Sequence, residues 1–278
     1  MTTPEALAEF EAILGHRFRF ERVLGVGRNA RVAAAIDMTT GERVVVKVLH
    51  AGLGASIEAD RFEREMAWLD RLAHPRIGTI RMTGIARGRV YFVMPFVEGP
   101  TVRQRLDADG PMPADAVGTV GMELLDLLGH AHAAGVVHRD VEPSNILLTA
   151  DGAMLIDFGL ARAIEVSSGD RVTLAGVVIG TSAYMSPEQC RGDDCTAASD
   201  LYSLGCVLFE MLAGRPPFVD EHPIALQLQH LQRPAPDVRT LVPDVPEALA
   251  ATIARALAKA PEDRWADAAA MQAALAAR

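Results

Sequence analysis

The local sequence pattern changes once along the chain, near residues 94–99. Before this point, Val and Ile runs broken by glycines predict strands, interrupted by one helix near 57–73 with apolar residues at helical spacing. After it, the pattern predicts mostly helices and one β-hairpin at 146–156. Strands and helices segregated in this way predict an α+β fold with two lobes. The helices expected in the second part span 101–107, 113–135, 199–213, 222–232, 247–259 and 265–277.

The predicted domain organisation follows this division. Residues 1–17 form an N-terminal helical extension, because Thr3-Pro4-Glu5 supplies a cap, a proline in the first turn and then an acid. Residues 18–278 form the main domain, with a strand-rich lobe over 18–97 and a helical lobe over 98–278.

Charge and composition exclude several classes of protein. With 27 basic and 36 acidic residues the formal net charge is −9, which argues against general binding to nucleic acids or anionic membranes. The longest uncharged run, 172–187, has 16 residues and is shorter than the roughly 18 needed for a membrane span. Acids within the first 20 residues argue against an export signal, and three cysteines are too few for a disulfide framework. We therefore expect a cytoplasmic protein.

Two features of the strand-rich part indicate anion binding. Gly25-Val26-Gly27 lies between two predicted strands, where backbone N–H groups can approach a phosphate closely; the alternative is a simple hairpin turn. Lys47 alternates with Val45 and Leu49 on one face of a strand, so it needs an anion if it is buried. Glu65, on the apolar stripe of the 57–73 helix, is a candidate partner; the alternative is an exposed lysine and an unrelated glutamate.

The most informative residues surround the 146–156 hairpin. Asn145 directly precedes its first strand and Asp157 follows its second, so both lie at the open end of the hairpin. Amide and carboxylate oxygens at one place suit Mg²⁺. Asp140 lies just upstream, where it can accept a proton from a hydroxyl group.

Together these residues resemble the motifs of protein kinases, and in particular the eukaryotic-like bacterial serine/threonine kinase family. The resemblance covers about residues 18–274. It implies a bilobal kinase fold, in which a small antiparallel β-sheet lobe with one main helix accompanies a larger, mostly helical lobe. The matching segments are the glycine loop 25–32, Val46-Lys47, the hinge-like segment 93–99, His138-Arg139-Asp140, Asn145, Asp157-Phe158-Gly159, Gly180-Thr181, Ser186-Pro187-Glu188, Asp200 and Arg264.

The resemblance implies transfer of the ATP γ-phosphate, with Mg²⁺, to Ser or Thr hydroxyls of protein substrates. In this scheme Lys47 contacts the α- and β-phosphates and pairs with Glu65. Asn145 and Asp157 bind Mg²⁺, and Asp140 orients and deprotonates the substrate hydroxyl.

The resemblance also implies where the nucleotide binds. The residues expected to surround it are Gly25, Val26 and Gly27 at the phosphates, Val32 and Val45 above the adenine, Leu147 below it, Met94 as gatekeeper, and the Pro95 carbonyl and Val97 amide at the adenine edge.

An activation loop is implied between Asp157 and Glu188. Thr173 is the expected phosphorylation site, and Thr181 is the residue expected to face the substrate and to mark Ser/Thr specificity. Glu188 and Arg264 are expected to form the ion pair that anchors the end of this segment. Self-association for autophosphorylation in trans is compatible with this scheme.

Glu142 departs from the family pattern. The family has a lysine two residues after the catalytic aspartate, where it reaches the γ-phosphate, and here the charge is reversed. Loss of a phosphate contact predicts impaired transfer. A pseudokinase that binds nucleotide or partners is therefore an alternative, and a small-molecule phosphotransferase is a third. The resemblance further allows the chain to be the cytosolic part of a longer membrane-anchored receptor kinase.

Overall fold

The computed structural model describes residues 3–27, 30–50, 72, 74–78, 80–158 and 182–277. The chain divides into two compact units. The first contains Met1–Ala73 and Gly78–Glu98, and the second contains His74–Ile77, Gly99–Gly159 and Gly180–Arg278.

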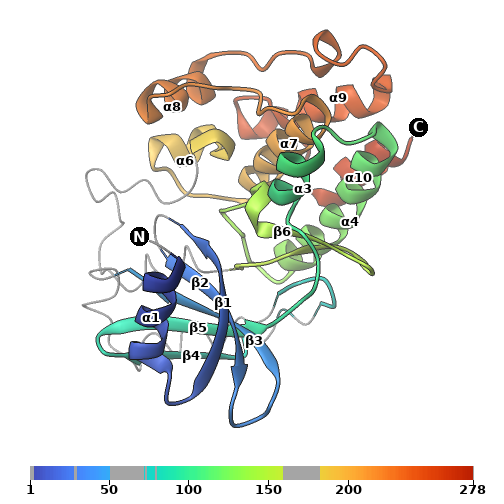
Figure 1. Cartoon of the computed structure of the whole chain (residues 1–278). Coiled ribbons are helices and arrows are strands. Elements are labelled where there is room, and N and C mark those ends of the chain that lie inside the picture. Colours follow the sequence, from blue (N-terminus) through green and yellow to red (C-terminus); the bar gives the residue numbers. More distant parts are fainter. Residues whose placement is uncertain are drawn as a thin grey trace. The chain divides into compact units, whose positions relative to one another are not determined.

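The first unit is built on a five-stranded antiparallel sheet with the strand order β1-β2-β3-β5-β4 (Figure 1). Short turns join β2 to β3 and β4 to β5, so each of these pairs is a hairpin, and β1 pairs antiparallel with β2, the next strand along the chain. The strands are β1 (Phe18–Val26), β2 (Ala30–Asp37), β3 (Arg43–Leu49), β4 (Met82–Ala86) and β5 (Arg89–Pro95).

The first helix, α1 (Thr3–Leu14), packs against β1 and β2 and contributes to the hydrophobic core of this sheet (Figure 1). The Phe10 and Phe20 rings lie 5.1 Å apart between their centroids. Although α1 precedes the predicted domain boundary at residue 18, it therefore shares the core of the first unit. The buried residues of this core are Phe10, Ile13, Leu14, Phe18, Phe20, Ala33, Ala35, Val44, Val46, Val48 and Val93.

The second unit is mostly helical, as the sequence predicts. Its central helix is α7 (Ala197–Ala213), which is buried continuously from Ser199 to Leu212. The other α-helices are α3 (Val102–Asp109), α4 (Ala114–Ala133), α6 (Pro187–Arg191), α8 (Pro223–Gln232), α9 (Glu247–Ala256) and α10 (Ala268–Ala276).

Two glycines allow these helices to approach one another closely. A Cβ atom on Gly121 of α4 would come within 2.9 Å of the Leu275 side chain of α10. A Cβ atom on Gly205 of α7 would come within 2.9 Å of the Ala256 Cβ of α9. Alanine at Gly205 would therefore force α7 and α9 apart, whereas alanine at Gly121 would first displace the end of the Leu275 side chain.

The predicted helix bounds need small corrections. The helix expected at 265–277 begins at Ala268, because the Asp267 side chain caps it by accepting a hydrogen bond from the Ala270 amide (2.7 Å). The helix expected at 247–259 ends at Ala256. Helix α6 was not predicted, since five residues are too few to show helical periodicity. The helix expected near 57–73 lies outside the described residues, apart from Leu72.

The predicted hairpin is present as β6 (Ile146–Thr149) and β7 (Gly152–Leu155), which pair antiparallel. Among the described helices, none combines the length and the apolar character that a membrane crossing requires.

Candidate active site

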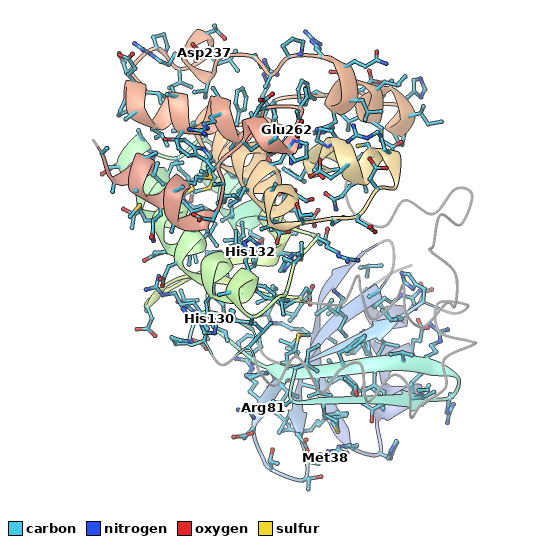
Figure 2. The ribbon with its side chains drawn as sticks, turned by 180° about the vertical axis from the view of Figure 1, so that it is seen from behind. Met38, Arg81, His130, His132, Asp237 and Glu262 are labelled. Carbon is cyan, nitrogen blue, oxygen red and sulfur yellow. The ribbon has the colours of Figure 1, made fainter. Side chains whose placement is uncertain are left out.

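The backbone of the predicted catalytic segment is fixed by one buried carboxylate on α7. Asp200 accepts hydrogen bonds from the backbone amides of His138 and Arg139, both at 2.8 Å. The ring of His132, near the C-terminal end of α4 (Figure 2), lies 2.8 Å from the same carboxylate. Because Asp200 is only 1% exposed, these contacts satisfy a charge that would otherwise be costly to bury.

Two residues of this region have backbone angles that favour glycine. Arg139 has φ of 68° and Asp157 has φ of 69°. Such angles cost a non-glycine residue of order 1 kcal/mol or more, so surrounding contacts must maintain them. At Arg139, hydrogen bonds hold the backbone on both sides of the Cα atom. Its amide donates to Asp200, and its carbonyl accepts from the Gln189 side chain (2.8 Å).

His138 connects the catalytic segment to the hairpin. Its Nδ1 accepts a hydrogen bond from the Asp140 amide (3.1 Å), and its Nε2 therefore carries the proton and donates to the Ile156 carbonyl (2.9 Å). Its ring also meets Phe158 edge-on, at 4.5 Å between centroids. Burial lowers the pKa of His138, which favours this neutral tautomer.

Asp140, Asn145 and Asp157 gather at the open end of the hairpin, the arrangement that the sequence predicts. Asn145 donates through Nδ2 to the backbone carbonyl (2.8 Å) and to the carboxylate (2.9 Å) of Asp140. The Ile156 amide donates to the Asn145 carbonyl (2.9 Å), which places Asn145 beside the residue that precedes Asp157. Because Nδ2 makes the bonds to Asp140, the Oδ1 atom of Asn145 is the one that could ligate a cation.

Glu142 lies in the same segment and is half-buried, with its backbone carbonyl accepting from the Asn145 amide (3.0 Å). The Glu142 charge influences the pKa of two neighbouring side chains, Tyr184 and His138. Burial raises the pKa of Tyr184 well above its usual range, and the charges of Glu210 and Glu142 add to that rise. At His138 the Glu142 charge acts against the lowering caused by burial.

Sequence reasoning missed a polar cluster around Glu210 of α7. The Tyr184 hydroxyl donates to Glu210 at 2.5 Å, and the Arg103 guanidinium donates to its other oxygen at 2.7 Å. The three residues are separated by up to 107 positions, so no local spacing could have indicated the cluster. It fixes the segment that follows residue 181 to the central helix.

The predicted ion pair between Glu188 and Arg264 is present, is bidentate and is buried. The two Arg264–Glu188 N···O distances are 2.7 and 2.8 Å, and Ser199 donates to the same carboxylate at 2.7 Å. Although burial acts in the opposite direction, the bonds from Arg264 and Ser199 lower the pKa of Glu188 to about 2. Arg264 also donates to three backbone carbonyls, of Ala258, Ala198 and Lys259.

A second buried histidine lies close to this ion pair. His230 is fully buried, and its Nδ1 lies 2.9 Å from the Tyr202 hydroxyl. Burial, with the nearby charge of Lys259 adding to it, lowers the pKa of His230 to about 4.

The lowered pKa of His230 predicts a loss of stability in mild acid. In the unfolded chain the His230 side chain becomes protonated below about pH 6.5, whereas in the folded domain it stays neutral until about pH 4. The free energy of unfolding should therefore fall by about 2 kcal/mol from this group between pH 7 and pH 5. Urea unfolding of wild type and His230→Gln at both pH values measures it, and the variant should lose less stability over this range. Identical losses in the two proteins would contradict the assignment.

The predicted nucleotide-binding residues of the first unit lie largely on one face of the sheet. In the strand register Lys47 is opposite Val32 and Phe92, and Val45 is opposite Met94, so these side chains share a face. It is the face opposite to the one that packs on α1. Lys47 and Val45 are half-buried, and Met94 is buried.

The remaining predicted residues lie at the ends of these elements or in the other unit. Gly25 and Val26 end β1, and the Gly27 amide donates to the Ala30 carbonyl (2.9 Å) at the tip of the β1–β2 hairpin. Pro95 ends β5 opposite Val44, and Val97 follows it. Leu147, on β6, is half-buried in the second unit. Glu65, Thr173 and Thr181 lie outside the described residues.

Comparison with known families decides the assignment. The protein kinase domain family matches residues 18–275. The chain belongs to the protein kinase family. The predicted resemblance to bacterial serine/threonine kinases is confirmed by relatives: the kinase domain is 39% identical over 279 residues to serine/threonine-protein kinase PknB of Mycobacterium leprae. It is 35% identical over 258 residues to a probable PknB of Lactococcus lactis. The matches cover 98% and 92% of this chain but only 43% and 41% of those relatives.

Solved structures confirm the predicted bilobal α+β kinase fold. A point mutant of the Mycobacterium tuberculosis PknI kinase domain aligns with a TM-score of 0.72 and 27% identity, covering 93% of this kinase domain and 94% of that chain. Rad53 1–466 in complex with AMP-PNP aligns with a TM-score of 0.75 and 27% identity, covering 96% of this kinase domain and 67% of that chain.

Proposed function

We propose that this domain transfers the γ-phosphate of ATP to Ser or Thr hydroxyls of protein substrates. The observation that carries the proposal is the hydrogen-bonded arrangement of Asp140 and Asn145 beside Asp157, in a chain of the protein kinase family. Catalysis of this transfer depends on positioning and on electrostatic stabilisation, and these residues provide both.

Asp140 is the proposed base and orienting group. Its carboxylate is aligned by Asn145, and its backbone amide is bound by His138, which in turn is fixed to the hairpin through Ile156. A carboxylate aligned in this way can hold the substrate hydroxyl in line with the phosphate and accept its proton.

Asn145 and Asp157 are the proposed ligands of Mg²⁺. An amide oxygen and a carboxylate are hard donors that suit this ion, and the open end of the hairpin brings both residues to one place. The ion would neutralise charge on the phosphates. On the first unit, Lys47 is the proposed contact of the α- and β-phosphates, and Val32, Val45 and Met94 the proposed adenine contacts.

Glu142 is proposed to slow the transfer. A carboxylate two residues after Asp140 replaces a cation that would stabilise the transferring phosphate, and its charge is already felt at His138 and Tyr184. The same residue favours a second function, a pseudokinase that binds nucleotide and signals through its partners. We keep this as the alternative.

Labelling with radioactive ATP and Mg²⁺ tests the proposal, with Asp157→Asn defining the background. We expect wild type to incorporate label that chelation of Mg²⁺ abolishes, and Thr173 to carry the phosphate by mass spectrometry. If wild type binds nucleotide in a fluorescence titration but incorporates no more label than Asp157→Asn, the pseudokinase function is correct instead.

The protein substrate, self-association for autophosphorylation in trans and a cytoplasmic location belong to the same proposal. The small-molecule alternative is tested with the same assay, by offering sugars and aminoglycosides as acceptors. Transfer to these but not to protein would replace the proposal.

A further inference from the structure

Helix α1 is joined to the sheet by a cluster of charges as well as by apolar packing. Glu9 forms ion pairs with two arginines, Arg31 of β2 and Arg89 at the start of β5. The Arg89–Glu9 distance is 2.7 Å. The Glu9 side chain is 23% exposed, Arg31 19% and Arg89 26%, so all three are substantially shielded from water.

The two arginines hold different parts of the sheet. Arg31 is opposite Val26 in the β1–β2 register, and the next residues toward the turn, Gly27 and Ala30, are joined by a backbone hydrogen bond of 2.9 Å. Arg31 therefore lies next to the Gly27–Ala30 pair, the last described contact of the β1–β2 pair that carries Gly25 and Gly27, which we call the glycine hairpin. Arg89 is instead opposite Ala86, beside the β4–β5 turn.

Arg31 depends on Glu9 more than an exposed arginine would. Its Nε is buried and, among the described residues, has no hydrogen-bond partner. The residue opposite Arg31 on the neighbouring strand β3 is Val48, which belongs to the core that α1 covers. Loss of the Glu9 charge would leave the Arg31 guanidinium, which lies beside Gly27 and Ala30, without its ion-pair partner.

We propose that Glu9 and Arg31 are positioning residues for nucleotide binding: α1, through this ion pair, sets the orientation of the glycine hairpin that contacts the phosphates. This rests on the proposed function, in which Gly25 and Gly27 approach the phosphates. The ion pair acts from the face of the sheet opposite to Lys47, so neither residue touches the nucleotide itself.

Substitutions of the two arginines provide a matched test, because each substitution removes one of the two ion pairs that Glu9 forms. Arg31→Gln and Glu9→Gln should raise the Kd for the fluorescent nucleotide mant-ATP with Mg²⁺ about 5- to 10-fold. Arg89→Gln should lower the melting temperature by about as much as Arg31→Gln does, but it should leave the Kd within about twofold of the wild-type value. Glu11→Gln, an exposed change on the same helix, should alter neither quantity.

Arg31→Lys keeps a cation opposite Glu9 and should restore the Kd to within about twofold of wild type, which separates charge pairing from loss of fold. If Arg31→Gln binds as tightly as wild type, or if Arg89→Gln weakens binding equally, the inference is wrong and the cluster is only structural. A folded wild type that binds no nucleotide would overturn the proposed function as well, so the two failures are distinguishable.

Discussion

Phosphate transfer by the Glu142→Lys variant should exceed that of wild type by about 10²- to 10³-fold. The change removes a carboxylate two residues from Asp140 and supplies the cation that stabilises the transferring phosphate. It should act mainly on the rate constant rather than on nucleotide affinity, because the charge matters most in the transition state. Initial rates against a generic basic protein, measured over a range of ATP concentrations, give both quantities.

Glu142→Gln is the control that separates the two contributions. It removes the negative charge without adding a positive one, so its rate should lie between those of wild type and Glu142→Lys. If all three proteins transfer phosphate at the same rate, another cation replaces the missing lysine and Glu142 has no effect on catalysis.

Removal of Arg264 should cause a large loss of stability. Arg264→Met leaves the Glu188 carboxylate buried without its bidentate partner and frees three backbone carbonyls. Breaking a buried pair in this way typically costs about 3–5 kcal/mol. Urea unfolding at pH 7 measures the decrease in the free energy of unfolding.

Arg255→Met is the matched control, since Arg255 is exposed and stacks on the Trp265 ring, 4.2 Å from its centroid. Its cost should be below about 1 kcal/mol. A loss of less than about 1 kcal/mol for Arg264→Met would mean that the pair contributes little, as exposed pairs do.

The sequence allowed prediction of those parts of the site that lie close together in the chain. The eight residues from His138 to Asn145 and the short hairpin after them are local, so spacing alone placed Asn145 and Asp157 at one end of it. The contacts that fix this segment are not local. Asp200 reaches His138 over 62 residues, and Arg103 reaches Glu210 over 107, so their geometry follows only from the packed fold.

The fold shows the same division between local and distant order. Strand periodicity predicted a sheet, but the position of β5 between β3 and β4 depends on pairing between strands that are distant in sequence. The helix at residues 3–14 was predicted from its cap, whereas its place in the core depends on Phe10, Ile13 and Leu14 meeting the sheet.

The packing of α1 on the sheet also determines where the chain can be shortened without exposing its core. The family match begins at residue 18, so a fragment trimmed to it would lose the helix and uncover Ala33, Ala35, Val44 and Val46 together. An apolar surface of this kind promotes aggregation in a shortened protein. Fragments intended for crystallisation or for inhibitor screening should therefore retain the first seventeen residues.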